Sequence, residues 1–213
     1  MNNRNPSSEK SKEAIFEDLK THPQDYTYLE LDNMGINTTD IKILASIIRS
    51  NPTLATSLKE LGLRDNKIDN EGVNILAELF HSVENNITFL DVQNNFADST
   101  GMRSFVEQYT KIRKHKENLT LFINNGHEND YAEIIKKCAN ITKIHLNNSS
   151  KINWSNKNFL LSFAQNKTLR TLNIGGTTFN KRDPVMKKEL AEFFDGLISN
   201  RYLKSTNFIH SLK

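Results

Sequence analysis

Hydrophobic positions change their spacing partway along the stretch from Leu58 to Phe80. Leu61 and Leu63 alternate with less apolar residues, which predicts a short strand with one buried face. The apolar residues from Gly72 onward recur at intervals of three and four positions, which predicts an amphipathic helix. One strand and one helix leave apolar faces uncovered, so this unit requires further copies of itself on either side.

The strand pattern recurs along most of the chain. Its apolar pairs are Leu29 and Leu31, Leu61 and Leu63, Leu90 and Val92, Leu121 and Ile123, Ile144 and Leu146, and Leu172 and Ile174. Successive pairs begin 23 to 32 residues apart. The helical patterns between them follow polar residues suited to cap a helix: Thr38 or Thr39, Asp69 or Asn70, Asp98 or Ser99, Asn129, Ser155, and Asp183 before Pro184. We therefore predict an α/β solenoid of about six repeats over residues 26–199.

Both ends of this solenoid are predicted to be covered. Residues 1–7 are expected to be disordered, and residues 8–25 to form a helix, capped by Ser8 or Ser11, that shields the first strand. Residues 200–213 are expected to close the other end with apolar side chains such as Leu203 and Phe208. Residues 8–213 are thus predicted to form a single domain.

The repeat pattern resembles a known family. From Leu58 the chain reads L-x-x-L-x-L-x-x-N-x-I, followed by Gly72 and Leu76, and this resembles leucine-rich repeats of the ribonuclease-inhibitor type. The resemblance implies a curved solenoid with a parallel sheet on its concave face, helices on its convex face and a role in protein recognition. Met34, Ser149 and Thr177 replace the repeat's asparagine, so those units are expected to be less regular. The Asn- and Lys-rich units also resemble leucine-rich-repeat effectors that intracellular bacteria deliver into host cells.

Charge is divided unevenly along the chain. The net charge is +3, but residues 1–100 carry −7 and residues 101–213 carry +10. In an elongated molecule this separates an acidic end from a basic end, which are either two solvated faces or a means of orienting a partner. The chain has no apolar run of roughly 20 residues, no apolar signal segment near its start and a single cysteine. These features predict a location in the cytoplasm, or in a host cytosol after delivery. We also expect a monomer.

Alternate residues of each predicted strand are expected to lie on the concave surface, because their neighbours point into the core. The predicted partner-binding residues are Tyr28, Glu30, Asp32, Glu60, Arg64, Phe89, Asp91, Gln93, Phe122, Asn124, Lys143, His145 and Asn147. Aromatic side chains among polar groups are typical of protein-binding surfaces. The alternatives are that Phe89 and Phe122 shield each other, that the strand register is displaced by one residue, or that helices, loops or an end cap bind the partner.

Catalytic and metal sites are not predicted. Cys138 shares an apolar helix face with Ile134 and Ile135, which indicates packing, and the histidines lack metal-ligand spacing. His127, Glu128 and Asp130 are close enough to meet a cation, but acidic residues also favour a first helical turn. Gly175 and Gly176 lack the pattern of a phosphate-binding loop. No cofactor is expected.

A basic stretch offers a second function. Residues 111–116 carry Lys111, Arg113, Lys114 and Lys116, at the predicted end of a helix. This favours either a solvated helix end or an adaptor for a polyanion or membrane surface. Nucleic acid is disfavoured because aromatic residues do not alternate with these cations. The predicted function is non-catalytic protein binding, with the adaptor as its alternative.

Overall fold

The computed structural model describes residues 10–82, 85–110, 119–122, 128–137, 141–146, 156–173 and 184–207. Seven strands form one parallel sheet in chain order. They are β1 (Tyr28–Glu30), β2 (Glu60–Gly62), β3 (Phe89–Asp91), β4 (Leu119–Phe122), β5 (Ile141–His145), β6 (Thr171–Asn173) and β7 (Ser205–Asn207). The predicted α/β solenoid of parallel strands is confirmed.

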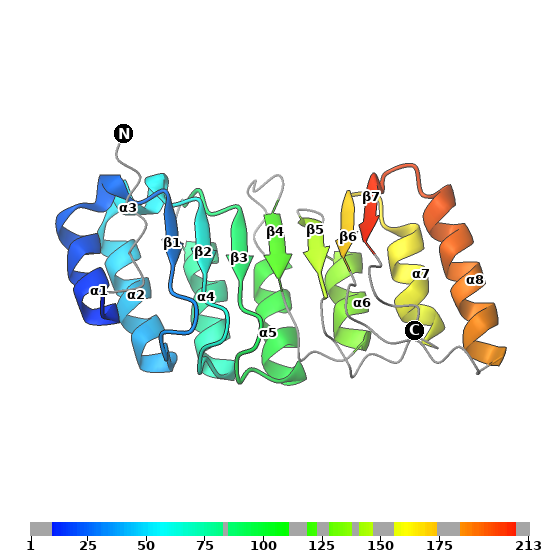
Figure 1. Cartoon of the computed structure of the whole chain (residues 1–213), viewed down its shortest axis with the longest axis horizontal. Coiled ribbons are helices and arrows are strands. Elements are labelled where there is room, and N and C mark those ends of the chain that lie inside the picture. Colours follow the sequence, from blue (N-terminus) through cyan, green and yellow to red (C-terminus); the bar gives the residue numbers. More distant parts are fainter. Residues whose placement is uncertain are drawn as a thin grey trace.

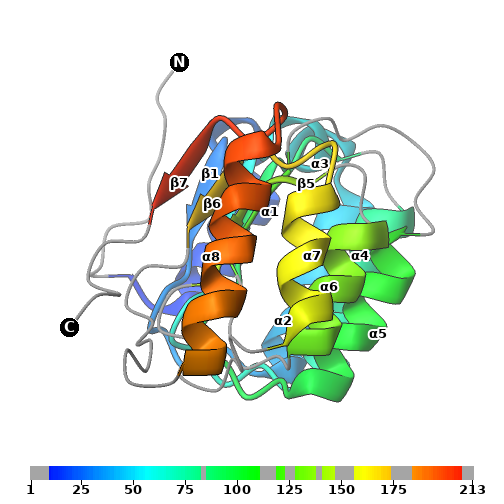
Figure 2. The same cartoon turned by 90° about the vertical axis from the view of Figure 1, so that its right-hand side faces the viewer.

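The helices lie on one side of this sheet, as Figures 1 and 2 show from two directions. They are α1 (Lys12–Thr21), the short 3-10 helix η1 (Pro23–Asp25), α2 (Thr38–Ser50), α3 (Pro52–Ser57), α4 (Asn70–Ser82), α5 (Ser99–Thr110), α6 (Glu128–Lys137), α7 (Lys157–Gln165) and α8 (Pro184–Ser199). The opposite side, called the sheet face below, carries no helix among the described elements. None of these helices is long and apolar enough to cross a membrane.

The core lies between the sheet and the helices. Leu29, Leu61, Leu90, Leu121, Ile144 and Leu172 align across neighbouring strands and are fully buried. The predicted strand register is therefore confirmed, and the register displaced by one residue is excluded. Because side chains alternate along a strand, this alignment fixes which residues lie on the sheet face.

Asparagine side chains join the turns that follow the strands. Asn66 accepts hydrogen bonds from the backbone N–H groups of Met34 and Ile36, at 3.1 and 2.9 Å, and donates to the carbonyl of Leu31 at 2.8 Å. Asn95 repeats the arrangement one unit later, donating to the carbonyl of Leu63 at 2.8 Å. These bonds satisfy backbone groups that would otherwise be buried without partners, so each asparagine fastens its own unit to the preceding one.

The residue before Asn66, before Asn95 and before Met34, which takes the asparagine's place in the first repeat, has a left-handed backbone. Asn33, Asp65 and Asn94 have φ values of 57°, 57° and 55°. Asparagine and aspartate tolerate this region better than most residues, so the repeat can turn here without glycine. The first three repeats therefore leave their strands with the same turn conformation.

The helix caps agree with the sequence in part. Ser11, Asp69 and Asp98 cap α1, α4 and α5 by accepting backbone N–H groups, as predicted. The prediction of Thr38 or Thr39 for α2 is wrong. Asn37 accepts from the N–H groups of Thr39 and Asp40, and Asp40 accepts from Asn37 in return, which forms a capping box.

Two further helix starts are displaced, by two residues in α6 and by one in α7. The helix α6 begins at Glu128, before the predicted cap Asn129, and α7 is capped by Asn156, which accepts from the N–H of Phe159. The α8 helix begins at Pro184, as predicted. The predicted caps Ser155 and Asp183 lie outside the described residues.

The two ends of the stack contain elements that the pattern did not reveal. Ile15, Phe16 and Leu19 of α1 are buried at the β1 end. The short elements η1 and α3 were not predicted, because single turns carry no periodic pattern. Residues 200–213 contain β7, which extends the sheet beside β6. Residues 1–7 and 208–213 lie outside the described part of the chain.

Candidate functional site

Parallel pairing aligns the residues of the sheet face in two rows. One row contains Tyr28, Glu60, Phe89, Thr120, Lys143 and Thr171, and the other contains Glu30, Gly62, Asp91, Phe122, His145 and Asn173. The predicted residues within described strands thus share one face. Phe89 pairs with Thr120, whereas Phe122 pairs with Asp91, so the two phenylalanines are not directly opposite each other. Asn124 and Asn147 lie outside the described residues.

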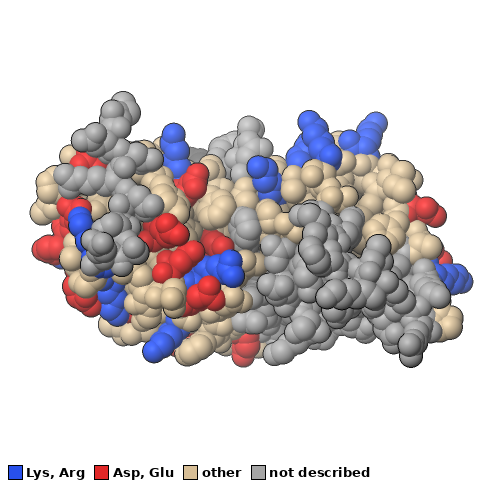
Figure 3. All heavy atoms as spheres, in the orientation of Figure 1, with Lys and Arg blue, Asp and Glu red and all other residues tan. Residues whose placement is uncertain are grey.

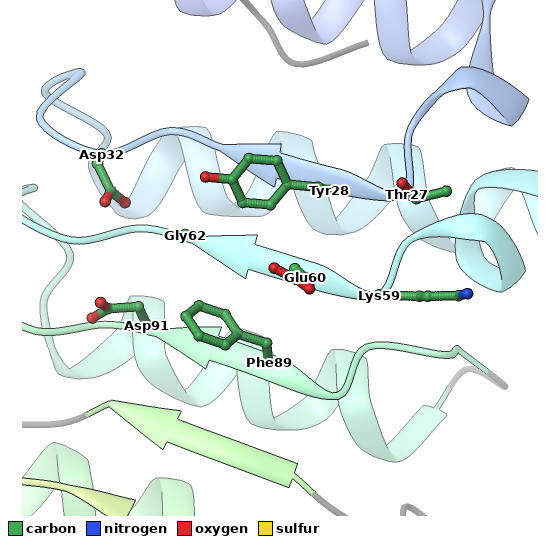
Figure 4. Close-up of a pocket in the computed structure, with 8 residues that line it drawn as sticks. All are labelled: Thr27, Tyr28, Asp32, Lys59, Glu60, Gly62, Phe89 and Asp91. Carbon is green, nitrogen blue, oxygen red and sulfur yellow. The ribbon is translucent and has the colours of Figure 1, made fainter. Parts of the chain in front are cut away.

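A pocket of 470 Å³ opens on the sheet face over β1, β2 and β3. Its lining residues are Thr27, Tyr28, Asp32, Lys59, Glu60, Gly62, Phe89 and Asp91. Figure 4 shows Asp32 and Asp91 on either side of Gly62, and the rings of Tyr28 and Phe89 on either side of Glu60. The volume falls in the range of pockets that hold small ligands or side chains of a partner.

Gly62 makes room for the side chain of Asp32. A Cβ atom at this position would lie 2.9 Å from Oδ1 of Asp32, closer than carbon and oxygen normally approach. The aligned residues on the neighbouring strands, Glu30 and Asp91, both carry side chains. The missing side chain therefore leaves room for the carboxylate of Asp32 to lie over β2, in the row that also contains Asp91.

The two aspartates are held by backbone donors. The backbone N–H of Arg64 donates to Oδ1 of Asp32 at 2.8 Å, and the backbone N–H of Gln93 donates to Oδ1 of Asp91 at 2.9 Å. Burial raises the pKa of Asp91 to about 6, and the nearby charge of Asp32 acts in the same direction. Burial also raises the pKa of Asp32. For both aspartates, the stabilisation that the protein gives the ionised carboxylate does not fully replace the hydration lost on burial.

The pocket's aromatic walls are half-buried. Burial, a hydrogen bond with Glu30 and the carboxylates nearby raise the pKa of Tyr28, so its phenol is protonated at neutral pH. Phe89 extends the apolar wall from β3. Rings of this kind offer rigid contact area at a small cost in side-chain entropy.

Other predicted residues differ in exposure. Arg64 is exposed, and its Nε lies 3.1 Å from Oδ2 of Asp65. Gln93 is only 5% exposed, which leaves it little surface for direct contact with a partner. Lys143 is exposed on β5. Burial, together with the positive charge of Lys143, lowers the pKa of His145 to about 4. Neither Lys143 nor His145 lines the pocket.

Figure 3 shows Asp and Glu side chains gathered on the half of the visible face that carries the N-terminal repeats. Several Lys and Arg side chains on the other half of this view stand near its upper rim. The guanidinium carbons of Arg170 and Arg201 lie 5.5 and 5.1 Å from the centre of the Tyr202 ring. The charge of Lys167 also acts on the phenol of Tyr202, and Lys204 follows two residues later in the chain. The predicted division of charge is visible on this surface.

Sequence reasoning missed Thr27, Lys59 and Gly62 as parts of the pocket. Gly62 had a detectable signal, since it is the one glycine in a row whose neighbouring strands carry acids. Cys138, His127 and the basic residues 111–116 lie outside the described residues, as do Gly175 and Gly176. Within the described residues, no group of three or more His, Cys, Asp or Glu side chains is placed to hold a metal ion.

Comparisons with known proteins identify the fold but no family. No family model matches the chain, and no curated protein matches its sequence. A solved structure of Leiomodin-1 Actin-Binding Site 2 is similar, with a TM-score of 0.50 and 14% sequence identity over 86% of this chain and 87% of that one. The likeness is one of fold. Together with the seven-stranded parallel sheet, it confirms the predicted leucine-rich-repeat solenoid.

Proposed function

We propose that this protein is a non-catalytic protein-interaction module that binds a partner through the sheet face over β1, β2 and β3. The observation that carries the proposal is the 470 Å³ pocket, in which two aromatic rings and two aspartates meet on strands fixed by their neighbours. A surface fixed in this way loses little conformational freedom on docking, which favours binding. The likeness to an actin-binding region supports the fold and leaves the partner's identity open.

Nine of the thirteen predicted residues fall into two groups under this proposal. Tyr28, Glu30, Asp32, Glu60, Arg64, Phe89 and Asp91 belong to or border the pocket and form the contact surface. Lys143 and His145 lie further along the sheet and serve at most as a secondary contact. We further propose that residues 8–213 act as one domain and one monomeric platform.

The experiment is affinity capture from a eukaryotic cell lysate with the wild type and two single variants. Phe89→Ala removes a pocket wall. Phe96→Ala removes another phenylalanine, 68% exposed, that does not line the pocket and serves as the matched control. A partner that is retained at about 150 mM salt, lost with Phe89→Ala and kept with Phe96→Ala supports the proposal. Loss with neither variant, or with Phe96→Ala alone, contradicts it.

A eukaryotic lysate also tests the effector role, which the repeats' composition suggests. A retained host protein would support delivery into a host cell as the setting of this function. Capture only from a bacterial lysate would contradict that role and leave protein binding in place.

The alternative function is an adaptor for a polyanion or a membrane surface, favoured by the four cations around Tyr202. None of these four side chains forms an ion pair with a described acid, so their charge is available to an anionic partner. Binding of anionic vesicles or of heparin that falls steeply with salt, and that is lost in Arg170→Gln but kept in Phe89→Ala, would support this alternative.

A further inference from the structure

We propose that the pocket over β1, β2 and β3 receives an arginine side chain from the partner protein. Its guanidinium would lie between Asp32 and Asp91, and its aliphatic stem would lie along Tyr28 and Phe89. This inference rests on the proposed protein-binding function and names the chemistry that the partner must present.

The pocket has two cations nearby, Lys59 and Arg64, but its aspartates pair with neither. Neither Asp32 nor Asp91 forms an ion pair with any residue that the structure describes. The nearest cation on β2's following turn, Arg64, is instead within 3.1 Å of Asp65. Lys59 lines the far end of the pocket, and Figure 4 shows its ammonium group directed away from the two aspartates. Arg64 lowers the pKa of both aspartates without pairing with either, so a cation from a partner would compensate these carboxylates further.

Burial makes such compensation valuable. Asp91 is only 8% exposed, so its carboxylate has lost much of its hydration and keeps one backbone N–H donor in exchange. A partly buried carboxylate that gains a charged hydrogen-bond donor forms a stronger interaction than an exposed ion pair does. In the free protein, the lost hydration of the Asp91 carboxylate is not offset by a cation. A cationic partner would offset it on binding, and this favours association.

The geometry favours arginine over lysine. Guanidinium is planar and has donors on more than one edge, so it can bond to carboxylates on opposite sides of it. Asp32 and Asp91 lie on either side of Gly62, which has no side chain to stand between them. Guanidinium and its stem also pack well on aromatic rings, which Tyr28 and Phe89 provide. A lysine ammonium would satisfy one carboxylate well and the other less directly.

The test uses the purified full chain and three short blocked peptides that differ only in their central residue. That residue is arginine, lysine or citrulline, which is the neutral analogue of arginine. Binding is followed by two-dimensional NMR, because Gly62 and Asp91 line the proposed site and each gives a backbone N–H signal. We expect the arginine peptide to shift the signals of Gly62 and Asp91, and the citrulline peptide to bind at least about tenfold more weakly.

Three variants make the test specific. Asp32→Asn and Asp91→Asn each remove one charge while keeping the side chain's shape and its carbonyl acceptor, and each should weaken the arginine peptide by about tenfold. Asp65→Asn removes an exposed charge that does not line the pocket, and it should change the affinity by less than about twofold. Melting temperatures of all three establish that they fold.

Several results would overturn the inference. They are equal binding of the arginine and citrulline peptides, tighter binding of the lysine peptide, or equal losses from Asp65→Asn and Asp91→Asn. Displacement of the peptide by calcium at low concentration would assign the pocket to a metal ion. Self-association that Asp91→Asn abolishes would assign it to a second copy of this chain.

The inference and the proposed function can fail separately. A captured partner that depends on Phe89 but whose binding survives Asp32→Asn and Asp91→Asn would preserve protein binding and overturn the arginine pocket. An arginine peptide that binds as expected, without any partner that depends on Phe89, would preserve the pocket and contradict the proposed function.

Discussion

The side-chain amide of Asn66 donates to the carbonyl of Leu31 at 2.8 Å, across a separation of 35 residues in the chain. The same nitrogen also lies within hydrogen-bond distance of two carbonyls in its own unit, and Oδ1 accepts from two N–H groups of the preceding unit. One side chain thus satisfies five backbone groups where two repeats meet.

Replacing Asn66 should therefore destabilise the protein. Asn66→Ala leaves several buried backbone groups without partners, and we expect a loss of about 3 kcal/mol in the free energy of unfolding. Chemical denaturation followed by circular dichroism measures this change. Asn158→Ala, at an exposed position on α7, should change the free energy by less than about 0.5 kcal/mol. Equal effects of the two variants would contradict the role given to Asn66.

The capping box at the start of α2 supports a second prediction. Asn37→Ala removes an acceptor that satisfies the N–H groups of Thr39 and Asp40, and it should cost about 1 kcal/mol. Thr39→Ala replaces a residue in the first helical turn and should have an effect below about 0.5 kcal/mol. Thermal unfolding of both variants decides which residue is the cap. A larger loss from Thr39→Ala would restore the assignment made from the sequence.

That cap illustrates what the sequence could and could not predict. The repeat, the strand register and the inward leucines follow from periodicity, because an α/β unit can bury its apolar positions in only one way. Asn37, Thr38 and Thr39 are all suitable caps, and only the backbone conformation selects among them. The β7 strand has no alternating apolar pattern, since it is held at the edge by backbone pairing to β6.

The sequence predicted which residues share the face that carries the pocket, but it did not predict the pocket's shape. Alternation placed Tyr28, Asp32, Phe89 and Asp91 on one face, and parallel pairing then brings them together. The burial of Asp91 and Gln93 did not follow from alternation, because it depends on how the turns after the strands close over them. The role of Gly62 could not be predicted from its own repeat, because the side chain that it accommodates, Asp32, belongs to the preceding repeat.

His145 makes stability depend on pH in a predictable direction. Its pKa is lowered to about 4 by burial and by Lys143, against an ordinary value of 6.5. The unfolded chain therefore binds a proton more readily than the folded chain between these values, so the free energy of unfolding falls as the pH drops from 6.5 toward 4. Because the side chain is only half-buried, we expect a contribution of about 1 kcal/mol.

The His145 imidazole signal in NMR spectra should accordingly titrate near pH 4 in the folded protein. Lys143→Gln removes the neighbouring positive charge and should raise that midpoint slightly, because burial remains the larger cause. A midpoint near 6.5 in the wild type would show that the side chain is hydrated and would remove this part of the pH dependence.

Asp91 should act in the opposite direction over a similar range of pH. Its folded-state pKa of about 6 lies above the ordinary value of 3.8, so the folded chain binds the proton more tightly than the unfolded chain. Its contribution to stability is present below pH 4 and is lost as the pH rises through 6. Asp91→Asn removes the charge and keeps an acceptor for the N–H of Gln93. This variant should be more stable than the wild type at pH 7.5, by about 1 to 2 kcal/mol.

The measurement is denaturant unfolding of wild type and Asp91→Asn at several pH values between 4 and 8. The advantage of the variant should shrink as the pH falls, because the wild-type carboxyl then becomes neutral as well. The charges that act on Asp91 come from Asp32, which follows β1, and from Arg64 and Asp65, which follow β2. Asp65→Asn is therefore the control for a general change in charge.

An arginine peptide bound between the aspartates would stabilise the ionised form of Asp91. Its affinity should therefore weaken below pH 6 in the wild type and change less in Asp91→Asn. A variant that is less stable than the wild type at pH 7.5 would mean that Asp91 is already compensated, and the case for an external cation would be lost.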